Sequence, residues 1–77
     1  MNTTFPVINN IETGKRIEQL RKNNGYTVKQ LQDVFGFTSP QSIYKWQWGD
    51  TLPDISNLLM LATLFNCTIE EILVYAD

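Results

Sequence analysis

The side chains that could do chemistry in this sequence are mostly cations, and they gather in one part of the chain. All six lysines and arginines lie within residues 1–48, against three acidic residues, which gives this part a charge of +3. Residues 49–77 hold five acidic residues and no basic one, a charge of −5. A positive region of this kind can meet phosphate groups while the acidic part faces away, although a short chain also acquires such an asymmetry by chance.

The sequence contains few of the residues that catalysis or metal binding requires. The sequence has no histidine and one cysteine, Cys67, which excludes an internal disulfide and a zinc site. It also lacks a glycine-rich phosphate loop and a pair of carboxylates placed for acid–base work. We therefore expect no enzymatic activity, no metal and no cofactor, and we expect Cys67 to be a small buried apolar residue.

Length and composition indicate one small folded domain. The chain has 77 residues, of which 43% are hydrophobic and 12% aromatic, and this is too apolar for a disordered segment. The N-terminus has neither the basic nor the apolar part of a secretory signal, and no apolar run is long enough to cross a membrane. We expect a cytoplasmic protein without a membrane partner, and no small-molecule ligand is evident.

Two short helices between Thr27 and Gly49 form the central unit of the chain. Thr27 and Gln30 have the spacing of a capping box, so the first of these helices begins there. Its apolar stripe is Leu31, Val34 and Phe35. Gly36 ends it, because glycine adopts the left-handed conformation of a helix C-terminus without strain.

The second helix of the unit follows two or three residues later. Ser39 is predicted as its N-cap and Pro40 as its first residue. Ile43 and Trp46 face back toward the core, with Trp46 buried, and Gly49 ends the helix. Helices this short need other elements to hold them.

Three further helices supply that support, and the sequence predicts an all-α, five-helix domain over residues 11–76 after an extended arm at residues 1–10. The arm is compatible with packing along the body, pairing with another subunit, or fraying. A strand-like alternation appears only weakly, at residues 5–8.

The first helix should run from Asn9 or Asn10 to about Asn23, the fourth should begin after the N-cap Asp54, and the fifth should open with a Thr68–Glu71 capping box. The expected inward residues are Ile11, Gly14, Ile17 and Leu20 in the first helix, Ile55, Leu58, Leu59, Ala62 and Phe65 in the fourth, with Met60, Leu61 and Leu64 widening that surface, and Ile69, Ile72 and Leu73 in the fifth.

The order of these pieces resembles a known family. The matching segments are GKRIEQLRKNNGYT, QLQDVFGF, IYKWQWG, LPD, LLMLATLF and TIEEIL. Over residues 14–73 they are similar to the Xre/Cro-type helix-turn-helix domain of phage repressors and small bacterial regulators. The resemblance implies a compact five-helix bundle of the lambda-repressor-like type. It also implies a transcription regulator that binds double-stranded operator DNA sequence-specifically, usually as a homodimer.

The resemblance makes residues 40–48 the recognition helix. Its implied base-reading residues are Gln41, Ser42, Tyr44 and Lys45. An amide such as Gln41 pairs with adenine in two hydrogen bonds, worth about 1–3 kcal/mol of discrimination, and the Tyr44 ring can touch a thymine methyl. The implied phosphate-contacting residues are Thr27, Lys29, Thr51 and Trp48. For each of these residues a purely structural or solvated role is the alternative.

The chain departs from the family pattern at three places. The spacing from Gly36 to Ile43 indicates one extra turn residue near Thr38–Ser39. Gln32 occupies a site where the family prefers a small residue, and Trp48 stands where a polar or basic residue is usual. Together with the net acidity they leave open an antitoxin- or antirepressor-like protein-interaction module that keeps the fold without binding DNA. Arg16 and Arg21 are expected in ion pairs between helices, and Met60 and its neighbouring leucines are the first candidates for a dimer contact.

Overall fold

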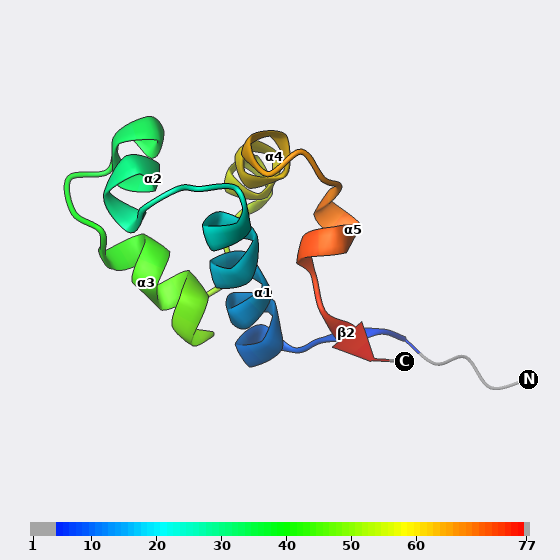
Figure 1. The fold of residues 1–77 in the computed structure, drawn as a ribbon. Helices are drawn as coiled ribbons and strands as arrows, with labels where there is room; N and C mark the ends of the chain where they lie inside the picture. The colour runs from blue at the N-terminus through cyan, green and yellow to red at the C-terminus, as the bar shows by residue number, and fades with distance from the viewer. Residues whose placement is uncertain (1–4, 77) are drawn as a thin grey trace, which may run out of the picture.

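The computed structural model describes residues 5–76, which form five helices and a small two-stranded ribbon (Figure 1). The elements in chain order are β1 (Val7–Ile8), α1 (Asn10–Asn23), α2 (Val28–Phe35), α3 (Gln41–Trp48), α4 (Ile55–Leu64), α5 (Ile69–Ile72) and β2 (Tyr75–Ala76). The predicted five-helix architecture is confirmed. The ribbon is an addition that the all-α prediction lacked.

Four of the five helices begin where local capping chemistry predicted. Asn9, Thr27, Asp54 and Thr68 each accept a hydrogen bond from the amide three residues ahead, and both predicted capping boxes form. Gly36 and Gly49 end α2 and α3 in the left-handed conformation, with φ of 71° and 79°.

The start of α3 differs from the prediction by one residue. The carbonyl of Pro40 accepts the first helical hydrogen bond, from the amide of Tyr44, so Pro40 is the N-cap and Gln41 the first helical residue. The Ser39 hydroxyl accepts a long hydrogen bond of 3.4 Å from the Gln41 amide. Serine therefore still serves this helix start, but from one position before the cap.

One apolar core lies between the helices. Its members are Ile17, Leu31, Ile43, Trp46, Leu58, Leu61, Ala62, Phe65 and Ile72. Trp46 is buried, as predicted, and Cys67 is half-buried against the core, where burial raises the pKa of its thiol. The predictions that Ile11, Ile55 and Leu59 face inward are wrong, since these side chains are exposed, and Val34 in the α2 stripe is exposed too.

Helix α1 is the support against which α3 lies. A Cβ atom added at Gly14 would overlap the backbone carbonyls of Trp46 and Gln47, so the two helices approach each other too closely for any larger residue. A Cβ at Gly49 would likewise meet the backbone of Ile11. These two close backbone approaches, at Gly14 and at Gly49, fix the position of α3 against α1.

The two ends of the described chain are joined to each other beside α1. Val7 pairs with Ala76 and Ile8 with Tyr75 in an antiparallel ribbon. Val74, just before β2, is also held at both its backbone groups: Asn9 N donates to its carbonyl at 2.8 Å, and its amide donates to the buried Thr13 hydroxyl at 2.9 Å. Of the alternatives for the predicted arm, the described part packs along the body. Residues 1–4 of that arm, and Asp77 of the acidic half, lie outside the described residues.

Within residues 5–76, none of the helices has the length and apolar character needed to cross a membrane.

Candidate nucleic-acid interface

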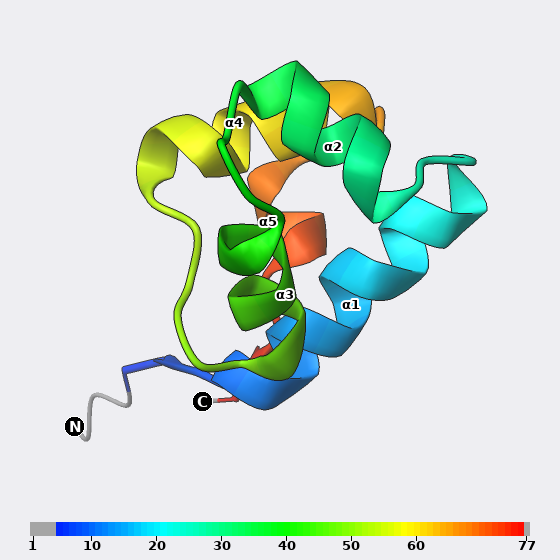
Figure 2. The same cartoon turned by 90° about the vertical axis from the view of Figure 1, so that its left-hand side faces the viewer.

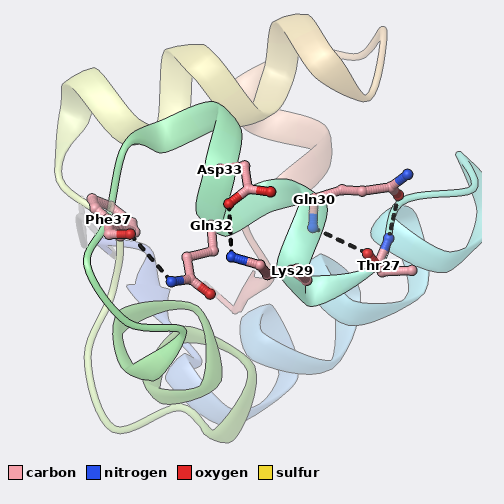
Figure 3. A network of polar contacts seen from close by, with 6 residues as sticks. All are labelled: Thr27, Lys29, Gln30, Gln32, Asp33 and Phe37. Atoms are coloured by element: carbon pink, nitrogen blue, oxygen red, sulfur yellow. Dashed lines mark hydrogen bonds and ion pairs between the residues drawn. The ribbon is translucent and has the colours of Figure 1, made fainter.

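The turn between α2 and α3 is held by Gln32 through two reciprocal hydrogen bonds. The Phe37 amide donates to the Gln32 carbonyl at 3.0 Å, and the Gln32 side-chain Nε2 donates back to the Phe37 carbonyl at 3.2 Å (Figure 3). Gln32 is partly buried at this point. The residue that departs from the expected small side chain therefore has a partner, and its amide fastens the turn.

The ring of Phe37 anchors the same turn to the core. It stacks on Phe35 with ring centroids 5.4 Å apart and meets the edge of Trp46 at 5.9 Å. Phe35 also packs edge-on against Trp46 at 5.6 Å. Since Trp46 belongs to α3, this aromatic cluster joins the end of α2, the turn and α3 into one unit.

Helix α3 has one buried and one exposed side. Ile43, Trp46 and Gln47 are buried against the body. In Figure 2 α2 and α3 face the viewer, and no other helix of the described chain passes in front of α3. Its exposed residues are Gln41, Ser42, Tyr44, Lys45 and Trp48. The four residues predicted to read bases therefore share an accessible helix surface with Trp48, while their contacts with DNA stay a prediction.

An arginine and a buried amide join α3 to α1. Arg21 Nε donates to Gln47 Oε1 at 2.9 Å, and its guanidinium also donates to the carbonyl of Tyr26 at 2.8 Å. The prediction of ion pairs at Arg16 and Arg21 is wrong: in the described part of the chain the salt bridges are Lys15–Glu12, Lys22–Glu18 and Lys29–Asp33. Arg21 does tie helices together, as expected, but through neutral acceptors.

These salt bridges moderate the positive charge of α1 and α2. Each joins side chains three or four residues apart on a helix surface, where such pairs contribute at most about 1 kcal/mol. The hydrogen bond from Lys22 holds the pKa of Glu18 below its ordinary value, so this carboxylate stays ionised. On α3 the exposed cation is Lys45, which forms no salt bridge within residues 5–76.

The predicted phosphate-contacting residues occupy the two ends of the unit. At the start of α2, Thr27 N donates to Gln30 Oε1 at 2.8 Å and Gln30 N donates to the Thr27 hydroxyl oxygen at 3.0 Å (Figure 3). The hydroxyl proton of Thr27 remains available to an anion because that oxygen acts only as an acceptor in the box. Lys29 Nζ lies 3.0 Å from Asp33, and both side chains are well exposed, so a phosphate can take the place of this carboxylate.

At the other end, the loop after Gly49 is folded back onto α3. The Lys45 carbonyl accepts from the amides of Asp50 at 3.0 Å and Thr51 at 3.5 Å, which holds Thr51 beside the last turn of the helix. The neighbouring Asp50 carboxylate is exposed and opposes an anion there. Trp48 is 60% exposed and stacks on Tyr44, with ring centroids 5.6 Å apart and an angle of 17° between the planes.

Two positions that matter for this surface were given no such role by sequence reasoning. Gln47 was not singled out, although it follows Ile43 by four residues and so falls on the buried side of the helix. Gln32 was noticed only as a departure. Its bond to the carbonyl of Phe37, five residues ahead, depends on the shape of the turn and has no local sequence signal.

Comparison with known proteins places this arrangement in a family. The family model described as "Helix-turn-helix" matches residues 17–72. The HTH-type transcriptional activator BcrR of Enterococcus faecalis is 30% identical over 63 residues, covering 82% of this chain and 30% of that protein. The competence pilus inhibition repressor of Acinetobacter baylyi is 33% identical over 67 residues, covering 87% of this chain and 60% of that protein. This chain therefore spans only part of the length of both relatives.

A solved structure supports the same fold. The restriction-modification controller protein C.AhdI from Aeromonas hydrophila superposes with a TM-score of 0.69 at 22% identity, covering 80% of this chain and 92% of that one. The family match covers α2, the turn and α3 together with most of their supporting helices. The chain belongs to the helix-turn-helix family, in its Xre/Cro-type, lambda-repressor-like form.

Proposed function

We propose that this chain is a sequence-specific DNA-binding transcription regulator that inserts α3 into the major groove and binds as a homodimer. The observation that carries the proposal is the exposed surface of α3, which presents an amide, a hydroxyl, a phenol and an ammonium group from a helix fixed on its other side. Hydrogen-bonding groups of these kinds are those that distinguish base edges in the major groove. The proposal assigns no catalytic reaction to the chain.

Gln41, Ser42 and Lys45 on α3, and three residues at the two ends of the unit, each have a proposed role. Gln41 reads adenine through its amide, Ser42 contacts a base or a phosphate, and Lys45 serves a guanine edge or the backbone. Thr27 and Lys29 at the start of α2, and Thr51 after α3, hold phosphates. In a dimer, two copies of α3 meet half-sites about one helical turn apart.

The two relatives support the regulatory role without fixing its direction. One is named a transcriptional activator and the other a repressor, and both align with this chain over more than four-fifths of its length. We therefore propose that the chain regulates transcription. Whether it activates or represses depends on the position of the operator.

The proposal is tested by selecting duplexes from a random library and titrating the enriched sequence by fluorescence anisotropy at several salt concentrations. We expect enrichment of one motif and a shallow salt dependence, with about three or four phosphates neutralised per protomer, because few cations are available. The Gln41→Ala variant should relax the preference at one position. Lys45→Ala and Lys29→Ala should each reduce the salt slope by about one unit at every sequence.

Lys15→Ala is the matched control, since Lys15 is an exposed, paired lysine on α1 and should leave the slope unchanged. If no sequence is enriched, and random duplex binds only beyond millimolar concentration at low salt, the proposal fails.

A protein-interaction module is the second candidate function. It is favoured by an apolar groove of about 290 Å³ between α2 and α4, lined by Val34, Leu59, Met60, Thr63 and Leu64, and by the net charge of −2. Isolation of a stoichiometric protein partner other than a second copy of this chain, covering residues 40–48 or this groove, would support it. A duplex complex that survives physiological salt would count against it.

A further inference from the structure

Tyr44 and Trp48 form a stacked aromatic pair on the exposed side of α3. They are four residues apart, so they lie on the same side of the helix, and their rings are nearly parallel at 17°. Tyr44 is 38% exposed and Trp48 60% exposed. The stack holds both rings in place before any partner arrives, which reduces the entropy lost on binding.

The ring faces of this pair suit an apolar group better than a phosphate. Neither side chain is a cation, and the faces of aromatic rings carry partial negative charge that repels phosphate oxygens, so only the Tyr44 hydroxyl and the Trp48 indole N–H, at the ring edges, could donate to a phosphate. Intercalation between bases is also disfavoured, because each ring already covers one face of the other. Among the groups that line the major groove, the apolar one is the C5-methyl of thymine.

The position of the pair along α3 limits how far from the Gln41 contact its base can lie. Trp48 follows Gln41 by seven residues, and at about 1.5 Å per residue it lies about 10.5 Å further along the helix. A helix in the major groove is inclined to the DNA axis, so this distance corresponds to at most about three base steps of 3.4 Å each. The pair therefore falls within the same half-site as the base read by Gln41.

We propose that Tyr44 and Trp48 together form a thymine-reading surface, which packs against the C5-methyl group of a thymine within about three base pairs of the position read by Gln41. This inference rests on the proposed function, and it moves Trp48 from a phosphate contact to a base contact. It makes the aromatic pair a determinant of specificity, where the rest of α3 offers hydrogen bonds.

The test is a scan of the selected operator in which each thymine is replaced in turn by deoxyuridine, which removes only the methyl group. The wild-type protein should bind about fourfold more weakly when the contacted thymine is replaced, as expected for the loss of one buried methyl group. Replacement of other thymines should have little effect. Placing 5-methylcytosine at the contacted position should bind better than cytosine there.

Variants assign that difference to the pair. Trp48→Ala and Tyr44→Ala should bind the thymine and deoxyuridine duplexes equally, whereas Trp48→Phe, which keeps a ring for stacking, should retain part of the difference. Ile55→Ala is the matched control, because it truncates another exposed apolar side chain, on α4, and should keep the full difference. Circular dichroism checks that each variant is folded.

The outcomes separate this inference from the proposed function. If the wild-type protein binds the selected duplex but no thymine position is sensitive to its methyl group, the thymine-reading surface is overturned and the proposed function stands. The same holds if the methyl effect persists in Trp48→Ala and Tyr44→Ala, which includes the case in which Trp48→Ala weakens binding to the thymine and deoxyuridine duplexes by the same factor. If no duplex is bound at all, the proposed function fails and this inference with it.

Discussion

At the scale of single residues, the hydrogen bond from Arg21 to Gln47 helps to hold α3 in its position against α1. Gln47 is only 8% exposed, and its side-chain oxygen accepts from Arg21 Nε, while the same guanidinium holds the carbonyl of Tyr26 just before α2. A neutral amide loses less hydration on burial than a carboxylate would. The guanidinium can therefore join α1, α3 and the entry to α2 without a buried ion pair.

Replacing Arg21 by methionine should destabilise the domain by about 2 kcal/mol, because the buried oxygen of Gln47 loses its donor while the apolar volume is kept. Gln47→Leu should also destabilise it, but the double variant Arg21→Met/Gln47→Leu should lose less than the sum of the two. Urea denaturation followed by circular dichroism measures these free energies of unfolding. Arg16→Met, at an exposed arginine of the same helix, should change stability by less than about 0.5 kcal/mol. Strict additivity in the double variant would show that the two side chains do not act together.

At the scale of elements, what could be predicted from the sequence was what depends on near neighbours. The helix starts at Thr27, Asp54 and Thr68 follow from side chains that bind an amide three residues ahead, so a short window contains the whole cause. The terminal ribbon joins Val7 to Ala76, residues far apart in the sequence, and its two-residue strands left only the weak alternation noted at residues 5–8.

The apolar stripes were predicted too wide for the same reason. Periodicity shows which residues share a side of a helix, but the number of them that are covered depends on the neighbouring helices. In this small domain Ile11 and Leu59 lie beyond the edges of those contacts and stay exposed. For the candidate site, burial of Ile43 and Trp46 was enough to predict which α3 residues are accessible. The base that each one meets depends on a partner outside the chain.

The turn between α2 and α3 gives a prediction at this scale. Gln32→Ala removes the side-chain hydrogen bond to the Phe37 carbonyl and should lower the free energy of unfolding by about 1 kcal/mol. Operator affinity, measured by anisotropy where the variant is still fully folded, should fall further than this loss explains, because α3 is no longer held at one angle to α2. Gln32→Glu should do no better, since an ionised carboxylate cannot donate to that carbonyl. Gln19→Ala, at an exposed glutamine on α1, is the control. If Gln32→Ala binds the operator with wild-type affinity, the hydrogen bond from the Gln32 side chain to the Phe37 carbonyl does not position α3.

At the scale of the whole molecule, the exposed surfaces differ in chemistry. The α3 surface is polar and aromatic, whereas the groove between α2 and α4 is lined mainly by the apolar residues Val34, Leu59, Met60 and Leu64. Leu59 and Met60 are both exposed. Apolar surface of this kind favours contact with another protein, and the proposed homodimer would cover it while leaving α3 open to the groove of DNA.

Leu59→Asp should therefore weaken self-association without unfolding the protomer, because the side chain is exposed and its replacement would place a charge in an apolar contact. Sedimentation equilibrium should show the wild-type chain as a dimer at micromolar concentration and the variant as a monomer, with unchanged circular dichroism. Operator affinity should fall as well, since one protomer then meets one half-site and loses the gain from simultaneous binding. Ile11→Asp, at an exposed apolar residue outside the groove, should leave the association constant unchanged. A Leu59→Asp variant that dimerises like the wild type would place the homodimer contact on another surface of the molecule.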